Sequence, residues 1–263
     1  MNPANVLACL KQLMPHWNAA DIHSLDYLTG GYSNANYALT YDRQRFVLRI
    51  PQRPQPYVDR RRERAWYQRL PTEIGPKPIA LDPETGVMLS PWAEGTLLID
   101  AWPSLNLSDL INYLRRLHET LPAESRTYDV SELMMEYGVA DHQTVATAAP
   151  EKQFVTCHND LNPWNILVTD QGWVTLDWEF VGLNDPLFDL VSLHQGLGLS
   201  SANLLEFASM YLPAEDCQTR LPAATKAYWL REYGWAWYQI HNGNQRPEIS
   251  AQMALAEDAL SLL

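Results

Sequence analysis

Residues 158–165 have the sequence HNDLNPWN, and Asp177-Trp178-Glu179 begins twelve residues after Asn165. Phosphoryl transfer needs a carboxylate near the attacking hydroxyl and oxygen ligands for magnesium, because the metal neutralises charge on the transferring phosphate. A loop that holds Asp160 and, five residues later, Asn165 can direct the carboxylate toward an acceptor and the amide toward the metal. The two short strands predicted before Asp177 would return that residue beside them. The pattern therefore indicates phosphoryl-transfer chemistry.

The apolar spacing on either side of this loop divides the chain into two lobes. In the first lobe, strands are predicted at 22–28, 37–41, 46–50, 78–81 and 87–89, and helices at 3–15 and 59–70. Residues 91–95 resemble a linker, and the spacing beyond them is mostly helical, apart from strands at 166–168 and 174–176. We therefore expect an α+β, bilobal fold, with a small antiparallel β lobe carrying one helix over 1–91 and a larger, mainly helical lobe over 92–263.

The composition excludes several classes of protein. With 46% hydrophobic and 19% charged residues, the 263-residue chain is expected to be globular. Its net charge of −12 repels phosphate backbones, which argues against nucleic-acid binding. No apolar run reaches the roughly 20 residues of a membrane helix, and the N-terminus lacks a signal-peptide pattern, so we expect a cytoplasmic protein without a membrane span. Three widely spaced cysteines indicate neither a disulfide framework nor a zinc site. No feature predicts the oligomeric state.

Charge is unevenly distributed along the chain. Residues 43–69 hold nine arginines against two carboxylates, which fits an anionic ligand, although solvated helix faces give the same pattern. From residue 157 to the end, thirteen carboxylates face four basic side chains, which fits a cationic ligand. Hydrolase and dinucleotide-binding patterns are missing from the sequence, since it contains no GxSxG, HExxH or GxGxxG. The charge pattern is thus compatible with an anionic donor and a cationic acceptor.

The chain resembles the aminoglycoside phosphotransferase and choline kinase superfamily of protein-kinase-like enzymes over roughly residues 22–260. Residues 28–37, LTGGYSNANY, are similar to its nucleotide loop, and residues 46–51, FVLRIP, to its third strand. Residues 176–190, LDWEFVGLNDPLFDL, are especially similar to bacterial choline and thiamine kinases. The resemblance implies a protein-kinase-like fold and an enzyme that uses ATP and Mg²⁺ to phosphorylate an alcohol.

The same resemblance implies roles for residues of the second lobe and the DWE motif. It makes Asp160 the catalytic base or hydroxyl-orienting group, and Asn165 and Asp177 the magnesium ligands. His158 is expected to brace the loop, and Asp189 to be a buried carboxylate that accepts hydrogen bonds from it. A non-catalytic pseudokinase that binds a nucleotide or a protein is the alternative from another class. Such a module is expected to have lost Asp160, Asn165 or Asp177, and all three are present.

The nucleotide site implied by the resemblance comprises Gly31, Ser33, Asn34, Arg49, Glu63, Ser90 and Trp92. The first three would present backbone and side-chain donors to phosphates. Arg49 stands where protein kinases have a lysine, and arginine keeps the charge while adding a planar fork suited to phosphate. Glu63 is expected to pair with Arg49. Ser90 and Trp92 fall where the family contacts adenine, although core packing is an equal alternative for Trp92.

The acceptor is the least determined feature. Residues 227–239 carry six aromatic side chains, and helical spacing places Trp235 and Tyr238 on one stripe. That stripe is expected to form part of an aromatic wall for a cation, with core packing as the alternative. Glu179 is assigned to the metal, to the substrate or to a structural ion pair. We expect a small cationic alcohol similar to choline or ethanolamine, with thiamine or an aminoglycoside as the alternatives.

Overall fold

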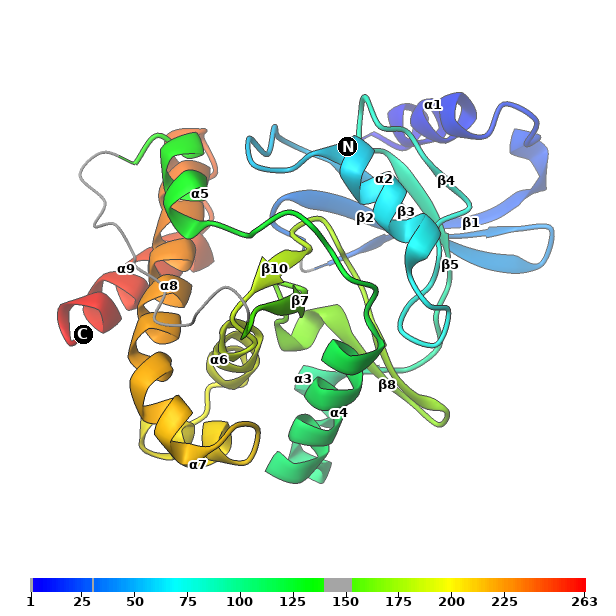
Figure 1. Ribbon diagram of the computed structural model, residues 1–263. Helices are drawn as coiled ribbons and strands as arrows, with labels where there is room; N and C mark the ends of the chain where they lie inside the picture. Colours follow the sequence, from blue (N-terminus) through cyan, green and yellow to red (C-terminus); the bar gives the residue numbers. More distant parts are fainter. Residues whose placement is uncertain (1, 30, 140–152) are drawn as a thin grey trace. The chain divides into compact units, whose positions relative to one another are not determined.

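The structure is a computed structural model that describes residues 2–29, 31–139 and 153–263 (Figure 1). The chain divides into two compact units. The first comprises Met1–Thr96 and Leu167–Glu179, and the second comprises Leu97–Ile166 and Phe180–Leu263. An antiparallel sheet dominates the first unit and helices dominate the second, so the predicted α+β class is confirmed.

The first unit contains a five-stranded antiparallel sheet with the order β1-β2-β3-β5-β4. Its strands are β1 (Ile22–Leu28), β2 (Asn34–Tyr41), β3 (Gln44–Pro51), β4 (Ala80–Leu81) and β5 (Met88–Pro91). All five predicted strands are present, although β2 begins three residues before its predicted start. Asp42 and Arg43 join β2 to β3 with φ angles of 45° and 64°. Two consecutive positive φ angles are typical of the tight hairpin turns that match strand twist.

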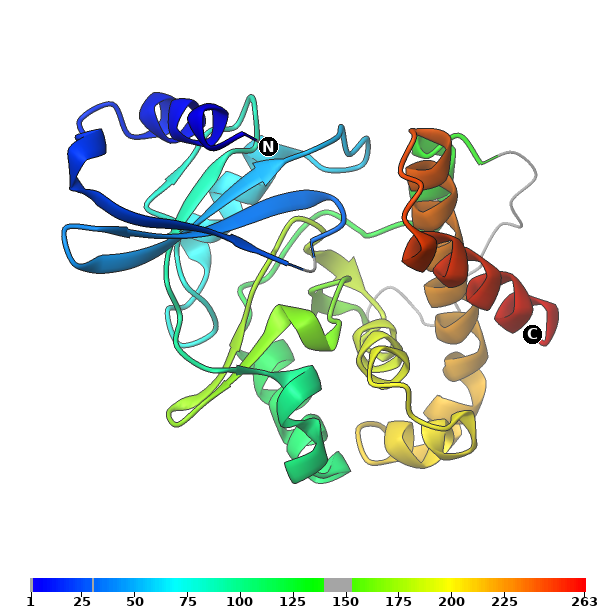
Figure 2. The ribbon, with the colours of Figure 1, turned by 180° about the vertical axis from the view of Figure 1, so that it is seen from behind.

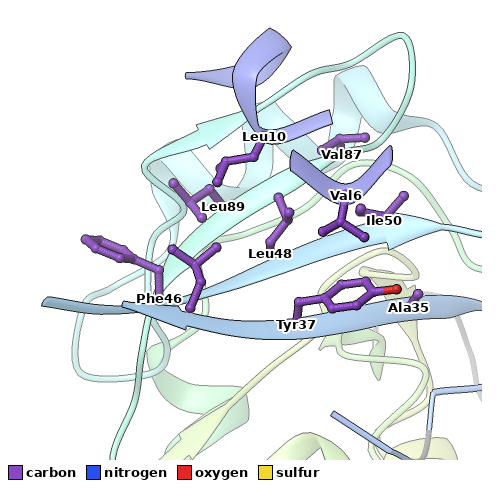
Figure 3. Packing of buried hydrophobic residues seen from close by; sticks show 10 residues of the cluster. Val6, Leu10, Ala35, Tyr37, Phe46, Leu48, Ile50, Val87 and Leu89 are labelled. Atoms are coloured by element: carbon purple, nitrogen blue, oxygen red, sulfur yellow. The ribbon is translucent and has the colours of Figure 1, made fainter. Parts of the chain in front are cut away.

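Two helices accompany this sheet. Helix α1 (Pro3–Leu13) buries Val6 and Leu10 against a cluster that includes Leu48 and Leu89 of the sheet (Figure 3). Helix α2 (Arg60–Arg69) begins after Asp59, whose carboxylate accepts hydrogen bonds from two backbone amides of the first turn. Such N-capping satisfies donors that a helix end otherwise leaves without partners. The capped first turn positions the charged side chains of α2 that matter below.

The segment Leu167–Glu179 belongs to the first unit although it is remote in sequence. It contains most of the hairpin of β8 (Ile166–Thr169) and β9 (Gly172–Thr175), and β6 (Thr96–Leu97) lies beside β8. The Thr175 amide donates to the Ile74 carbonyl over 2.7 Å, and a Cβ on Gly75 would lie 2.4 Å from the Thr175 carbonyl. The two units therefore differ from the predicted lobes, which divided the chain only once, at residue 91. The local spacing of apolar residues does not predict this long-range hydrogen bond.

The second unit is mainly helical. Its helices are α3 (Leu98–Ala101), α4 (Leu107–Thr120), α5 (Val130–Glu136), α6 (Leu187–Gly196), α7 (Leu204–Ser209), α8 (Ala214–His241) and α9 (Pro247–Ser261), and β7 (Val155–Cys157) pairs with β10 (Gly182–Asn184). Helix α9 packs against α8 at an oblique angle (Figures 1 and 2). Helices α5, α6 and α7 also pack on α8. Among the residues described, no helix has the length and apolar character needed to cross a membrane.

Candidate active site

Asp189 of α6 fixes the backbone of the HNDLNPWN loop. Its carboxylate is fully buried and accepts hydrogen bonds from the backbone amides of His158 and Asn159, each over 2.8 Å. The His118 ring lies 3.1 Å from the same carboxylate. The His158 ring, also fully buried, accepts from the Asp160 amide over 3.2 Å. His158 and Asp189 thus occupy the bracing positions that the sequence predicted for them.

The Asp160 side chain is held by amide groups of its own loop. Asn165 donates from Nδ2 to Asp160 Oδ2 over 3.1 Å and to the Asp160 carbonyl over 2.9 Å. Asn162 donates to Asp160 Oδ1 over 3.2 Å. Because the nitrogen of the Asn165 amide faces Asp160, its oxygen remains the atom suited to a hard cation. The loop therefore presents an oriented carboxylate and an amide oxygen, as a phosphotransferase would require.

Arg231 of α8 contacts Asp160, and the sequence did not predict this contact. Its guanidinium donates from Nη2 to Asp160 and from Nη1 to Glu232. Burial alone would lower the pKa of Arg231, but the carboxylates of Asp160 and Glu232 raise it well above its ordinary value. The guanidinium therefore stays charged. The only sequence signal was an adjacent Arg-Glu pair inside an otherwise aromatic helix.

In the first unit, Arg49 of β3 connects the predicted partner Glu63 to Asp177. Arg49 Nη1 lies 2.8 Å from Asp177 Oδ1, and Nη2 donates to Glu63 over 2.9 Å. Burial would lower the pKa of Arg49, but Glu63 and Asp177 outweigh it and hold the guanidinium charged. The ion pair between Arg49 and Glu63 confirms that these residues meet, as predicted.

Arg60 joins this cluster and was missed as a site residue. Its Nη1 donates to Glu63 over 2.8 Å and to Glu179 over 2.7 Å. Burial, followed by repulsion from Asp177, raises the pKa of Glu179 to about 7 despite Arg60 and Arg49. Glu179 thus occupies a structural ion pair, one of the three roles left open for it. The signal for Arg60 was its position three residues before Glu63, which places both on one helix face.

Asp177 is the accessible carboxylate of this cluster. Its side chain is 29% exposed, against 0% for Glu63 and 5% for Glu179, and oxygens of all three lie within 4.8 Å of one another. Asp177 also has a positive φ of 60°, a conformation uncommon outside glycine and asparagine. Carboxylate oxygens suit Mg²⁺, so Asp177 is the member of the cluster that fits a metal ligand. The other two neutralise arginines.

In the predicted nucleotide loop, the backbone at Gly31 lies very close to the backbone at Asn34. A Cβ on Gly31 would lie 2.2 Å from the Asn34 carbonyl, so only glycine fits there without displacement of the backbone. The Ser33 carbonyl accepts from the Gln52 amide over 3.0 Å, which ties the loop to the end of β3. Asn34 is 6% exposed, and its side-chain oxygen has no hydrogen-bond partner among the residues described. This buried polar atom and the glycine cradle are compatible with a nucleotide.

Ser90 and Trp92 lie at the end of β5. Ser90 is 8% exposed and lies opposite Val47 in the ladder between β3 and β5. The Trp92 amide donates to the Arg45 carbonyl over 3.0 Å, and the Arg45 guanidinium lies 3.8 Å from the centre of the Trp92 ring. The Trp92 amide and ring are therefore engaged within the first unit, and adenine contact at this segment stays a prediction.

The two aromatic residues predicted for the acceptor lie on α8 and are half-buried. Tyr238 stacks on Tyr137, with ring centroids 5.1 Å apart and planes 24° apart. Trp235 lies one helical turn before Tyr238. Trp229 of the same helix is 7% exposed and belongs to the core, whereas Tyr233 and Trp237 are half-buried like Trp235 and Tyr238. The aromatic wall for a cation at Trp235 and Tyr238 stays a prediction.

The comparisons with known proteins agree with this geometry. The profile of a family described as "Phosphotransferase enzyme family" matches residues 25–228. Protein LicA of Haemophilus influenzae is 29% identical over 204 residues, a match that spans 68% of this chain and 60% of that protein. The predicted resemblance to this family is thereby confirmed.

Solved structures share the fold over nearly the whole chain. Choline kinase LicA from Streptococcus pneumoniae matches with a TM-score of 0.75 and 17% identity, over 99% of each chain. A choline/ethanolamine kinase family protein from Mesorhizobium loti matches with a TM-score of 0.73 and 22% identity, over 99% of this chain and 95% of that one. These likenesses confirm the predicted protein-kinase-like fold.

Proposed function

The chain belongs to the phosphotransferase enzyme family, and on that premise we propose that it transfers the γ-phosphoryl group of ATP to the hydroxyl of a small cationic alcohol. The observation that carries the proposal is the Asp160 carboxylate, oriented by the amides of Asn162 and Asn165. Two amide donors that fix one carboxylate are expected where an acceptor hydroxyl must be positioned for in-line attack.

Each residue has a distinct task in this proposal. Asp160 accepts the hydrogen bond of the acceptor hydroxyl and aligns its oxygen with the γ-phosphorus. In this proposal the Asn165 amide oxygen and the Asp177 carboxylate would be the ligands of Mg²⁺. When bound, Mg²⁺ neutralises charge on the phosphate oxygens. Arg49 adds a fixed positive charge, and Glu63 keeps its guanidinium in place.

ATP as donor is supported by the first unit. The glycine at position 31 permits the tight approach of the loop to the Asn34 carbonyl, and such loops offer backbone donors to phosphates. Ser33, Asn34 and the segment of Ser90 and Trp92 complete the proposed nucleotide contacts. Use of Mg²⁺-ATP and a cytoplasmic location are part of the same proposal.

The choice of acceptor rests on charge and on the relatives. The second half of the chain is acidic, and Trp235 offers a half-buried indole whose face attracts a cation. One structural neighbour is described as a choline kinase and another as a member of the choline/ethanolamine kinase family. We therefore propose choline or ethanolamine as the acceptor class, ahead of thiamine and aminoglycosides.

The test measures nucleotide binding and turnover separately. Calorimetry is expected to detect binding of Mg²⁺-ATP, and a panel of choline, ethanolamine, thiamine, kanamycin and glucose is expected to show ADP release with the first two. Asp160→Asn should keep nucleotide affinity but lose turnover, whereas Asp177→Ala should lose metal-dependent binding as well. Asp170→Asn, in the exposed turn between β8 and β9, is the matched control and should leave both unchanged.

Three outcomes would count against parts of the proposal. Failure to bind ATP or GTP with magnesium would exclude the kinase assignment. Binding without turnover on any acceptor would favour the pseudokinase alternative. ADP release with only kanamycin or only glucose would reject the choline-like acceptor and leave the kinase assignment intact.

A further inference from the structure

A buried chain of polar contacts extends from the HNDLNPWN loop to the C-terminal helix. Asp160 contacts Arg231, Arg231 contacts Glu232, and Glu232 Oε2 accepts from Gln252 of α9 over 2.7 Å. The side chains of Asp160, Arg231 and Glu232 are 16%, 11% and 10% exposed, so water screens these contacts only partly. The Phe180 ring lies 5.6 Å from the guanidinium carbon.

We propose that Arg231 is a positioning residue that fixes the orientation of the Asp160 carboxylate for phosphoryl transfer. The inference rests on the proposed function of Asp160 and assigns to that site a residue that the sequence motifs do not contain. Arg231 acts through Asp160, and Gln252 of α9 acts through Glu232 on Arg231.

The hydrogen bonds that Asp160 accepts support the positioning role of Arg231. Without Arg231, the hydrogen-bond donors left to the Asp160 side chain among the described residues would be two neutral amides, those of Asn162 and Asn165. Charge-assisted hydrogen bonds are roughly twice as strong as neutral ones. Arg231 is thus the strongest restraint on the angle of this carboxylate, and loss of it would let the carboxylate rotate away from the acceptor hydroxyl.

The guanidinium shape matters as well as its charge. Arg231 uses Nη2 for Asp160 and Nη1 for Glu232 at the same time. A lysine carries one nitrogen on a flexible stem and cannot reproduce that fork. Glu232 in turn neutralises the guanidinium, and Gln252 holds the second oxygen of Glu232. Gln252 therefore restricts Glu232, and Glu232 restricts Arg231. Through these contacts the packing of α9 on α8 would affect Asp160 in the HNDLNPWN loop.

Arg220 is a matched control on the same helix. Its side chain is 5% exposed and pairs with Asp185 over 2.6 Å and 2.9 Å, and it also donates to Gln153 over 3.0 Å. Both arginines are thus buried on α8 and paired with an aspartate. Only Arg231 contacts the proposed hydroxyl-orienting residue, so the two should differ in turnover even where they cost similar stability.

The experiment compares Arg231→Met with Arg220→Met in steady-state kinetics. Misplacement of a positioned group can cost on the order of 100-fold in rate, so we expect Arg231→Met to lower kcat at least about tenfold with the KM for ATP within about twofold. Arg220→Met should keep kcat within about twofold. Arg231→Lys should recover only part of the loss, and Gln252→Leu should lower kcat in the same direction by less. If a methionine variant fails to fold, the Arg231→Lys and Arg220→Lys pair makes the same comparison.

Two kinetic results would overturn the inference. One is an equal loss of kcat in the two arginine variants, which would show a structural role only. The other is a wild-type kcat in Arg231→Met. In addition, Asp160→Asn combined with Arg231→Met should shift the midpoint of urea unfolding by less than the sum of the single shifts. This cycle needs no turnover. An inactive wild-type protein would therefore refute the proposed function alone, and additive midpoints would refute the contact itself.

Discussion

Replacement of Arg60 by methionine removes one of the two positive charges in the carboxylate cluster of the first unit. Arg60 donates to Glu63 over 2.8 Å, to Glu179 over 2.7 Å and to Gln55 over 2.8 Å. With all groups ionised, Arg49 and Arg60 face the carboxylates of Glu63, Asp177 and Glu179, which gives the cluster a net charge of −1. Loss of the Arg60 charge changes this net charge to −2. Methionine keeps most of the side-chain volume, and the loss is therefore mainly electrostatic.

The expected cost follows from burial. Removal of one partner from a buried ion pair costs about 3–5 kcal/mol, because the other charge is left in a poorly solvating environment. The Arg60 side chain is 12% exposed and Arg49 remains beside Glu63, so we expect the lower end, about 3 kcal/mol. Arg61→Met is the control on the same helix. Arg61 pairs with Glu84 over 2.6 Å, but their side chains are 76% and 68% exposed, so no measurable change is expected.

The cost should depend on pH with a defined sign. The pKa of Glu179 is raised to about 7 in the folded protein, from its ordinary 4.5. The folded state therefore binds this proton more tightly than the unfolded state, and the stability linked to it declines as pH rises from about 4.5 through 7. Below pH 6 Glu179 is mostly protonated, and a neutral carboxyl is stabilised less by the Arg60 charge than a carboxylate is. The destabilisation by Arg60→Met should consequently be larger at pH 8 than at pH 5.5.

Urea unfolding of wild type, Arg60→Met and Arg61→Met at these two pH values measures the effect. Midpoints compared at equal slopes report the change in stability. Adding Glu179→Gln to Arg60→Met should recover part of the loss at pH 8, because it removes the carboxylate left without its main partner. The reasoning fails if Arg60→Met is as stable as Arg61→Met at pH 8, or if its deficit grows as pH falls.

Two further predictions concern the phosphate loop and the thiols. Gly31→Ala should weaken Mg²⁺-ATP binding in calorimetry at least about tenfold, since a Cβ 2.2 Å from the Asn34 carbonyl must displace the loop, and unchanged affinity would show that this backbone approach is unimportant. Burial raises the pKa of Cys157 and of Cys217, so a thiol reagent at pH 8 should label Cys9 alone in the folded protein, and rapid labelling of Cys157 in mass spectrometry would contradict the packing.

Local patterns in the sequence were sufficient for the fold class and the motif residues. The short strand-like run Ile22–Leu28 was predicted with its observed bounds, and the Asp42-Arg43 turn followed from its position between two predicted strands. Glu63 was correctly paired with Arg49, although the resemblance to a family supplied that pairing. The strand and the turn are readable because side-chain periodicity and turn chemistry depend on residues close in sequence.

The tertiary structure alone determined which charges meet across long stretches of chain. Arg60 and Glu179 are 119 residues apart, and Arg231 and Asp160 are 71 apart, yet each pair forms a direct ion pair. An arginine on a helix has the same local pattern whether it faces water or a buried carboxylate. The difference arises from how the hairpin containing β9 joins the first unit and how α8 packs in the second, because burial converts a weak surface attraction into an obligatory contact.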